Sequence, residues 1–216
     1  MRLRIVVILV ALVAKQALDH GIRTDGHPGV VQVFWYFWTK CFGLSEAAVR
    51  LPFVVAGIFS VYFLYLIASL WFGKECGLYS ALTLAVLKYP ILYSQLARPY
   101  SFGLLFSLLS VWFLSRIVLI PQGKKYMNIS LYILSTALCM YTHYFSFLLA
   151  LIAGLYGVVV GSKEVKKLLI LSAIACAVLY LPHLFTTLHV LTHEKGLERL
   201  GTPGFFWLFN HLYFAL

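Results

Sequence analysis

The stretch Ser94-Gln95-Leu96-Ala97-Arg98-Pro99-Tyr100 joins two apolar segments, residues 76–94 and 100–120, that are each long enough to cross a bilayer. A guanidinium at such a junction is costly unless an anionic group meets it. The stretch therefore predicts a membrane helix on either side of it and a polar function at the junction itself.

Composition supports a membrane protein. Hydrophobic residues make up 62% of the 216 residues and charged residues only 11%, whereas a soluble domain carries about 25% charged residues. The net charge of +10 would suggest a nucleic-acid partner in a soluble chain. Here the lysines and arginines lie mainly in short segments between apolar stretches, as in membrane proteins. We therefore expect the lipid bilayer, and no nucleic acid, as the partner.

The apolar segments predict an all-α fold, a polytopic transmembrane helical bundle with about seven membrane helices. The first follows Arg2 and Arg4 and ends at Ala14, and it is either an uncleaved membrane helix or an interfacial one. The stretch 30–42 is aromatic and too short to span, which predicts an interfacial helix at headgroup level. The six further spans are predicted at 51–72, 76–94, 100–120, 127–141, 145–161 and 168–190.

Basic residues occupy alternate connections, which predicts that those connections are cytoplasmic. The intervening connections, 19–28, 94–99, 142–144 and 193–203, are then extracytoplasmic, in a cell membrane that we expect to be a bacterial inner membrane. Alternation alone brings scattered polar side chains to this outer face, as in a binding site. These side chains are Asp25, His27, Arg98 and His143.

Arg98 is the first candidate for a binding residue. Its planar fork of donors can hold a phosphate bidentately, and a lipid-linked phosphate would supply that anion at this depth. Gln95 and Tyr100 add polar groups beside it. The alternative is an arginine that extends to any lipid headgroup at the interface.

Asp25 and His27 lie on a loop that Gly26, Pro28 and Gly29 make turn tightly. The carboxylate is a candidate general base toward an acceptor hydroxyl, and the imidazole a candidate to orient it or to neutralise a leaving phosphate. The alternative is a solvated turn, since these residue types are common in turns.

His143 interrupts an apolar run, with Thr142 before it and Tyr144 after it. Both His143 and Tyr144 are candidates to contact the ligand near Arg98. The alternative is a buried histidine that a neighbouring hydroxyl satisfies.

The cysteines show no spacing typical of a metal site or a disulfide framework. We predict no metal-binding residues and no cofactor, and the sequence leaves dependence on a divalent metal open. The cysteines are Cys41, Cys76, Cys139 and Cys176.

Taken in order, these segments resemble the GT-C superfamily of polytopic glycosyltransferases, in the branch that groups protein O-mannosyltransferase-like, aminoarabinose transferase-like and Rgt-type enzymes. The loop Asp25-Gly26-His27-Pro28-Gly29 is similar to the family's Asp-x-His-Pro-Pro, and residues 93–100 are similar to its Tyr-Ser-Gln-Glu-Ala-Arg-Pro-Tyr. Two further segments, Ser45 to Phe53 and Trp71-Phe72-Gly73, resemble the two ends of the helix between them. The resemblance extends from about Ala14 to Leu216.

The resemblance implies a transferase of the cell envelope that moves a sugar from a polyprenyl-phosphate carrier to an extracytoplasmic lipid, glycan or protein, with inversion at the anomeric carbon. It assigns the carrier phosphate to Arg98 and places Asp25 and His27 in the catalytic site. A polyprenyl-phosphate transporter, or a non-catalytic membrane protein that binds lipid phosphate, remains the alternative, because either needs the anionic pocket and no base.

The chain also departs from the family pattern. Leu96 replaces the frequent glutamate, and Gly29 replaces the second proline. The Asp-Glu pair that family members carry after their first membrane helix is not found upstream of Asp25. We therefore expect residues 1–216 to be the N-terminal part of a GT-C-like membrane domain, with a shortened start, and to lack the principal catalytic acid and the later helices.

Overall fold

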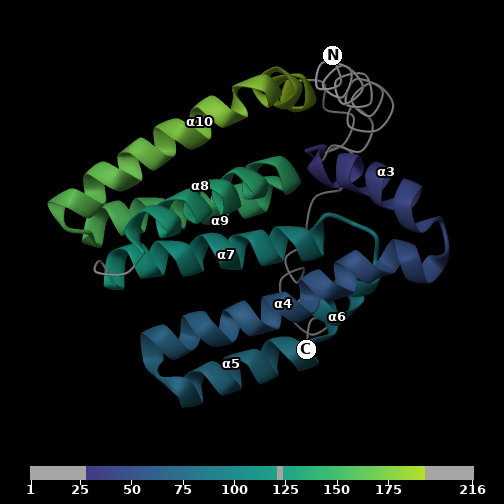
Figure 1. The fold of residues 1–216 in the computed structure, drawn as a ribbon, viewed down its shortest axis with the longest axis horizontal. Coiled ribbons are helices and arrows are strands. Elements are labelled where there is room, and N and C mark those ends of the chain that lie inside the picture. The colour runs from purple at the N-terminus through teal and green to yellow at the C-terminus, as the bar shows by residue number, and fades with distance from the viewer. Residues whose placement is uncertain (1–27, 121–123, 193–216) are drawn as a thin grey trace, which may run out of the picture.

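The computed structural model describes residues 28–120 and 124–192, and all regular structure in these ranges is α-helical (Figure 1). The all-α fold class is confirmed. The predicted segments 1–14, Asp25 and His27 lie outside the described residues. The helices are α3 (Val30–Phe42), α4 (Glu46–Phe72), α5 (Lys74–Val86), α6 (Lys88–Gln95), α7 (Tyr100–Leu119), α8 (Lys125–Thr142), α9 (Tyr144–Val160) and α10 (Lys163–Thr192).

Several helices are suited to a membrane by length and composition. Within the described ranges, α4, α7 and residues 163–185 of α10 are long and apolar enough to cross, and α5 with α6 makes a fourth crossing if the pair is one span. Helix α9 is apolar but shorter. The chain is therefore a multi-pass membrane protein.

The predicted continuous segment 76–94 is wrong in one respect, because two helices replace one. Helices α5 and α6 meet at an angle of 57°. Leu87 between them is extended, with φ −64° and ψ 132°. Pro90 is the physical cause, since it has no N–H to donate to the carbonyl of Val86, and the first turn of a helix is where a proline disturbs the fewest backbone hydrogen bonds. Pro90 accordingly lies in the first turn of α6.

Successive spans run antiparallel when α5 and α6 count as one, so α4 and α7 run parallel (Figure 1). Helix α7 lies between α4 on one side and α8 with α9 on the other. Successive connections therefore alternate between two ends of the bundle. We call the end that holds residues 43–45, 96–99 and 143 the aromatic end. We call the end that holds Gly73, the last turn of α7, the first turn of α8 and residues 161–162 the basic end.

Small and polar side chains mediate the helix packing, as is common between membrane helices. The Ser110 and Thr136 hydroxyls share a buried hydrogen bond of 2.9 Å between α7 and α8. The Trp71 indole N–H donates to the Ser115 hydroxyl at 3.0 Å and so joins α4 to α7. An apolar cluster fills the space between α7, α8 and α10, and it consists of Leu114, Ile117, Tyr132, Val165 and Leu169.

Helix α3 matches the predicted aromatic helix in both bounds, and its position at the headgroups stays a prediction. Phe34 of α3 packs edge-on against Phe102 of α7, with ring centroids 5.3 Å apart. Phe102 in turn contacts Phe53 of α4, which is fully buried. These rings fix α3 across the aromatic end of the bundle, directly after the buried Pro28.

Candidate functional site

The junction that contains Arg98 is a tight turn between α6 and α7. The Arg98 N–H donates to the Leu96 carbonyl at 2.8 Å, and Pro99 then begins α7 with φ −60° and ψ −14°. Proline suits this place because its φ is preset for a helix. Its missing N–H costs nothing here, since the first N–H groups of a helix make no intrahelical hydrogen bond. The buried Ser101 hydroxyl donates to the Tyr93 carbonyl at 2.9 Å and ties the two sides of the turn together. The exposed Arg98 side chain therefore extends from a rigid backbone.

A row of aromatic rings connects this turn to the α8–α9 break. Tyr93 lies between Tyr89 and Tyr100, with ring centroids 5.9 Å and 4.5 Å apart. Tyr100 then lies 5.3 Å from the ring of His143. His143 in turn stacks on Phe145 at 5.6 Å. The structure thus brings Tyr100 and His143 together, although they lie on different helix ends.

His143 is the single extended residue between α8 and α9, with φ −158° and ψ 135°. Its Nδ1 accepts a hydrogen bond from the Phe145 N–H at 3.2 Å. A neutral ring that accepts at Nδ1 carries its proton on Nε2, which is then a donor. The half-buried imidazole therefore caps α9 and presents an N–H group at the aromatic end.

Gly103 allows α7 to approach this break closely. A Cβ at Gly103 would lie 2.6 Å from the Ser146 hydroxyl oxygen and 3.5 Å from the Cβ of His143. A larger residue here would push α7 away from α9 and separate the Tyr100 and His143 rings.

The other predicted binding residues lie at the same end. Gln95 is the last residue of α6 and has an exposed side chain. Tyr144 is the first residue of α9 and is half-buried. Asp25 and His27, the predicted catalytic residues, precede Pro28 in the chain and lie outside the described residues.

A second aromatic group, which sequence reasoning missed, lies between α8 and α10. The rings of Tyr141, Tyr180 and His183 are 5.3–5.5 Å apart by centroid. His183 is only 6% exposed, and its Nε2 has no hydrogen-bond partner. The Tyr141 hydroxyl donates at 2.7 Å to the carbonyl of Leu179, just before the helix reaches Pro182. A polar residue inside an apolar span is a functional candidate by default, so the pair Pro182-His183 was the available signal.

An apolar groove of about 420 Å³ opens between α4, α5, α6 and α7, and we call it the α4–α7 groove. Val54, Ile58, Val61 and Leu104 supply much of its apolar wall. Tyr93, Ser94 and Tyr100, from the two sides of the Arg98 turn, also line it. An apolar cavity of this size with a few polar groups is typical of a ligand site.

The described part of the chain contains no group of three His, Cys, Asp or Glu side chains placed to hold a metal ion. Its cysteines are free thiols, exposed at Cys41 and Cys76 and buried at Cys139 and Cys176.

The chain matches a known protein family over most of its length. The family model described as dolichyl-phosphate-mannose-protein mannosyltransferase matches residues 26–185. The chain belongs to this family. The resemblance to GT-C glycosyltransferases is thus confirmed, and no curated protein and no solved structure gives a significant match.

The residues that match the mannosyltransferase family include the elements of the candidate site. It starts inside the Asp25 loop and includes the Arg98 turn, the His143 break and the Tyr141 group. The family consists of glycosyltransferases of the GT-C type that use polyprenyl-phosphate-linked sugars in a membrane. The elements that meet at the aromatic end therefore all lie within the family's matched region.

Proposed function

We propose that this chain transfers a sugar from a polyprenyl-phosphate-linked donor to an extracytoplasmic acceptor. The observation that carries the proposal is that one rigid turn presents the Arg98 guanidinium and also lines the α4–α7 groove. A polyprenyl-phosphate donor has an anionic head and a long apolar tail, so it needs a cation beside an apolar groove. The family membership supports the same donor class.

The proposed chemistry is a single displacement with inversion. The acceptor oxygen forms a bond to the anomeric carbon while the bond from that carbon to the phosphate oxygen breaks. Asp25, in place of the family's upstream Asp-Glu pair, accepts the proton of the acceptor hydroxyl, and His27 helps to neutralise the departing phosphate. Arg98 holds that phosphate, and its charge matters most as negative charge develops on the leaving group.

Tyr100 and His143 fit a role in holding the sugar or the phosphate beside Arg98. Both are polar-tipped rings in one row. The His143 Nε2–H can donate a hydrogen bond to a phosphate oxygen or to a sugar hydroxyl. Gln95 and Tyr144 flank this row and are proposed as further binding residues.

The test is transfer from undecaprenyl-phosphate-linked mannose and glucose in membranes that contain the chain, compared with its Arg98 variants. We expect Arg98→Gln to lower transfer on the order of 100-fold, because a charge partner is lost. Arg98→Lys keeps the charge and loses the planar fork of donors. Its transfer should therefore lie between that of Arg98→Gln and that of the unchanged chain.

Arg50→Gln is the matched control. Arg50 lies at the aromatic end and is half-exposed, but it belongs to α4, outside the turn that lines the α4–α7 groove. Its guanidinium pairs with Glu46 at 2.7 Å on the same helix. The proposal fails if Arg98→Gln retains full transfer, or if Arg50→Gln lowers transfer as much. Saturable binding of undecaprenyl phosphate with no transfer from either donor would favour the carrier-binding alternative instead.

A further inference from the structure

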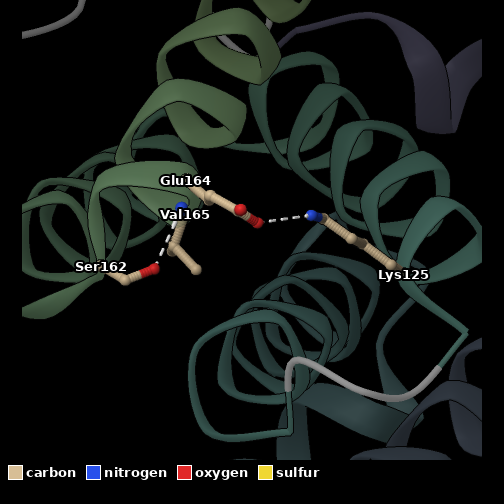
Figure 2. Close-up of polar contacts among 4 residues, drawn as sticks. All are labelled: Lys125, Ser162, Glu164 and Val165. Carbon is tan, nitrogen blue, oxygen red and sulfur yellow. Dashed lines mark hydrogen bonds and ion pairs between the residues drawn. The ribbon is translucent and has the colours of Figure 1, made fainter.

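A small cavity with several polar groups in its wall lies at the basic end, far along the bundle from the Arg98 turn. It has a volume of about 60 Å³ and lies between α7, α8 and the start of α10. Figure 2 shows one side of it, where Glu164 reaches from α10 across to Lys125 of α8. The polar residues that line it are Arg116, Lys125, Asn128, Ser162 and Glu164.

Two buried groups in this cavity have no hydrogen-bond partner. Asn128 is only 1% exposed, and its side-chain oxygen accepts no hydrogen bond. The Arg116 Nε is likewise buried and donates to no acceptor. Buried polar groups in folded proteins are almost always paired. A donor and an acceptor left unpaired in one cavity indicate a ligand that both accepts and donates hydrogen bonds.

Two cations, Arg116 and Lys125, and one carboxylate, Glu164, line the cavity, so its net charge favours an anionic ligand. The Arg116 guanidinium lies 5.6 Å from the ring centroid of Trp112, which holds its plane against α7. Lys125 Nζ lies 3.2 Å from Glu164 Oε2, and since both side chains are substantially exposed this pair is weak. The Ser162 hydroxyl accepts from the Val165 N–H at 3.4 Å (Figure 2) and keeps its own proton to donate. The cavity therefore offers several donors to an anion.

We infer that this cavity binds the headgroup of a hydroxyl-bearing anionic phospholipid, of the phosphatidylglycerol type. The phosphate accepts from Arg116, Lys125 and Ser162. A headgroup hydroxyl donates to the Asn128 side-chain oxygen. The cavity holds the polar groups that meet Arg116 and Asn128, while the rest of the headgroup and the acyl chains stay outside it, beside α7 and α8.

A lipid, rather than a free phosphate, fits the surroundings. Basic pockets between membrane helices at the cytoplasmic side are typical sites for anionic headgroups. Further lysines lie at the same end of the bundle and attract an anionic leaflet. They are Lys124, Lys163, Lys166 and Lys167. This inference is independent of the transferase activity proposed above.

The test is native mass spectrometry of the delipidated full chain with added phosphatidylglycerol, phosphatidic acid, phosphatidylcholine or inorganic phosphate. We expect one phosphatidylglycerol to be retained more tightly than phosphatidylcholine. Lys125→Gln should weaken its retention about fivefold, the value of one basic side chain at a membrane surface. Arg116→Gln should weaken it further, and Asn128→Leu should remove the preference for phosphatidylglycerol over phosphatidic acid.

Lys74→Gln is the matched control, because Lys74 is exposed at the basic end but begins α5, away from the cavity. Equal losses for Lys74→Gln and Lys125→Gln would overturn the site in favour of general charge attraction. Equal retention of phosphatidylcholine, or no retained lipid at all, would leave ordered water as the occupant and overturn it as well. Displacement of phosphatidylglycerol by inorganic phosphate at equal concentration would assign the cavity to a soluble anion. Lys125 is a surface residue, so its variant tests the site even where a buried substitution disturbs folding.

Discussion

The two ends of the bundle are built from different kinds of side chain. At the aromatic end, stacked rings cross from one helix to the next, as between Tyr93, Tyr100 and His143. At the basic end, long lysine side chains surround the helix termini, as at Lys125 and Lys163. A tyrosine or histidine has two side-chain torsions and a lysine has four, so the first loses less entropy when it is fixed.

The two kinds of side chain suit two tasks, because rings can position a ligand whereas lysines can orient the protein in the membrane. Stacked rings hold a polar tip in one place, which a site for a specific ligand requires. Flexible lysines supply charge without fixed geometry, which is sufficient to orient a membrane protein. The cavity around Asn128 is the exception at the basic end, because its unpaired groups are buried and fixed.

The largest expected effect tests whether proton transfer from the acceptor takes place at the aromatic end. Asp25→Asn should lower turnover by about 10²–10⁴-fold, the contribution of a general base. Binding of undecaprenyl phosphate should change by less than about twofold, because the carrier phosphate does not contact a base on the acceptor side. The measurement is single-turnover transfer beside equilibrium binding of the carrier.

Asp19→Asn is the matched control for this substitution, since Asp19 lies in the same expected external connection. Turnover that survives Asp25→Asn would remove the base from this loop. A loss of carrier binding equal to the loss of turnover would make Asp25 a structural residue.

A pair of glycines compares packing at the two ends. At Gly103 an added side chain would meet Ser146 beside His143, whereas at Gly157 it would meet Leu114 and Leu169 in the apolar cluster. Each change to valine should cost about 1–3 kcal/mol of stability through overpacking. We expect only Gly103→Val to lower transfer by more than its loss of folded protein explains, on the order of tenfold, because it separates the rings.

Thermal unfolding in detergent and transfer per folded molecule measure the two effects separately. If Gly157→Val lowers specific transfer as much as Gly103→Val, then the aromatic end has no special need for fixed geometry.

A smaller effect concerns the hydrogen bond that joins α4 to α7. Trp71→Phe removes the indole N–H that donates to Ser115 and keeps most of the ring packing. Side-chain hydrogen bonds between membrane helices contribute about 0.6 kcal/mol on average. We expect a fall of a few degrees or less in the unfolding midpoint and unchanged transfer, because Trp71 lies near the basic end. Ser115→Ala should give the same fall, and the double variant should add little to either.

Most of the helices were predictable from the sequence, because the parts of a helix that face lipid form apolar runs. Their ends were harder to predict. Helix α10 begins at Lys163 rather than at the predicted residue 168, because its first turn is polar and Ser162 accepts from the Val165 N–H. Hydropathy cannot detect a polar first turn, but a serine followed by an acidic residue is typical of a helix start.

The site was predictable only in part. Alternation of connections placed Arg98 and His143 at one end, and the structure has them there. The contact between Tyr141 and His183 depends on how α8 and α10 rotate about their axes, which no local pattern encodes. The roles of Asp25 and His27 stay predictions, because both lie outside the described residues.

The smallest expected effect compares two exposed ion pairs of the described residues, Arg50 with Glu46 at the aromatic end and Lys125 with Glu164 at the basic end. Exposed pairs contribute about 0.2–1 kcal/mol. Both acids also lie in the first turn of a helix, where a negative charge is favourable. We therefore expect Glu46→Gln and Glu164→Gln to lower the unfolding midpoint slightly and equally at low salt.

At 1 M salt the Debye length is about 3 Å, so the difference in unfolding midpoint between each variant and the unchanged chain should vanish. A difference for Glu164→Gln that persists at 1 M salt would mean that this carboxylate supports the bundle by contacts other than its charge, and the basic end would then share the fixed geometry of the aromatic end.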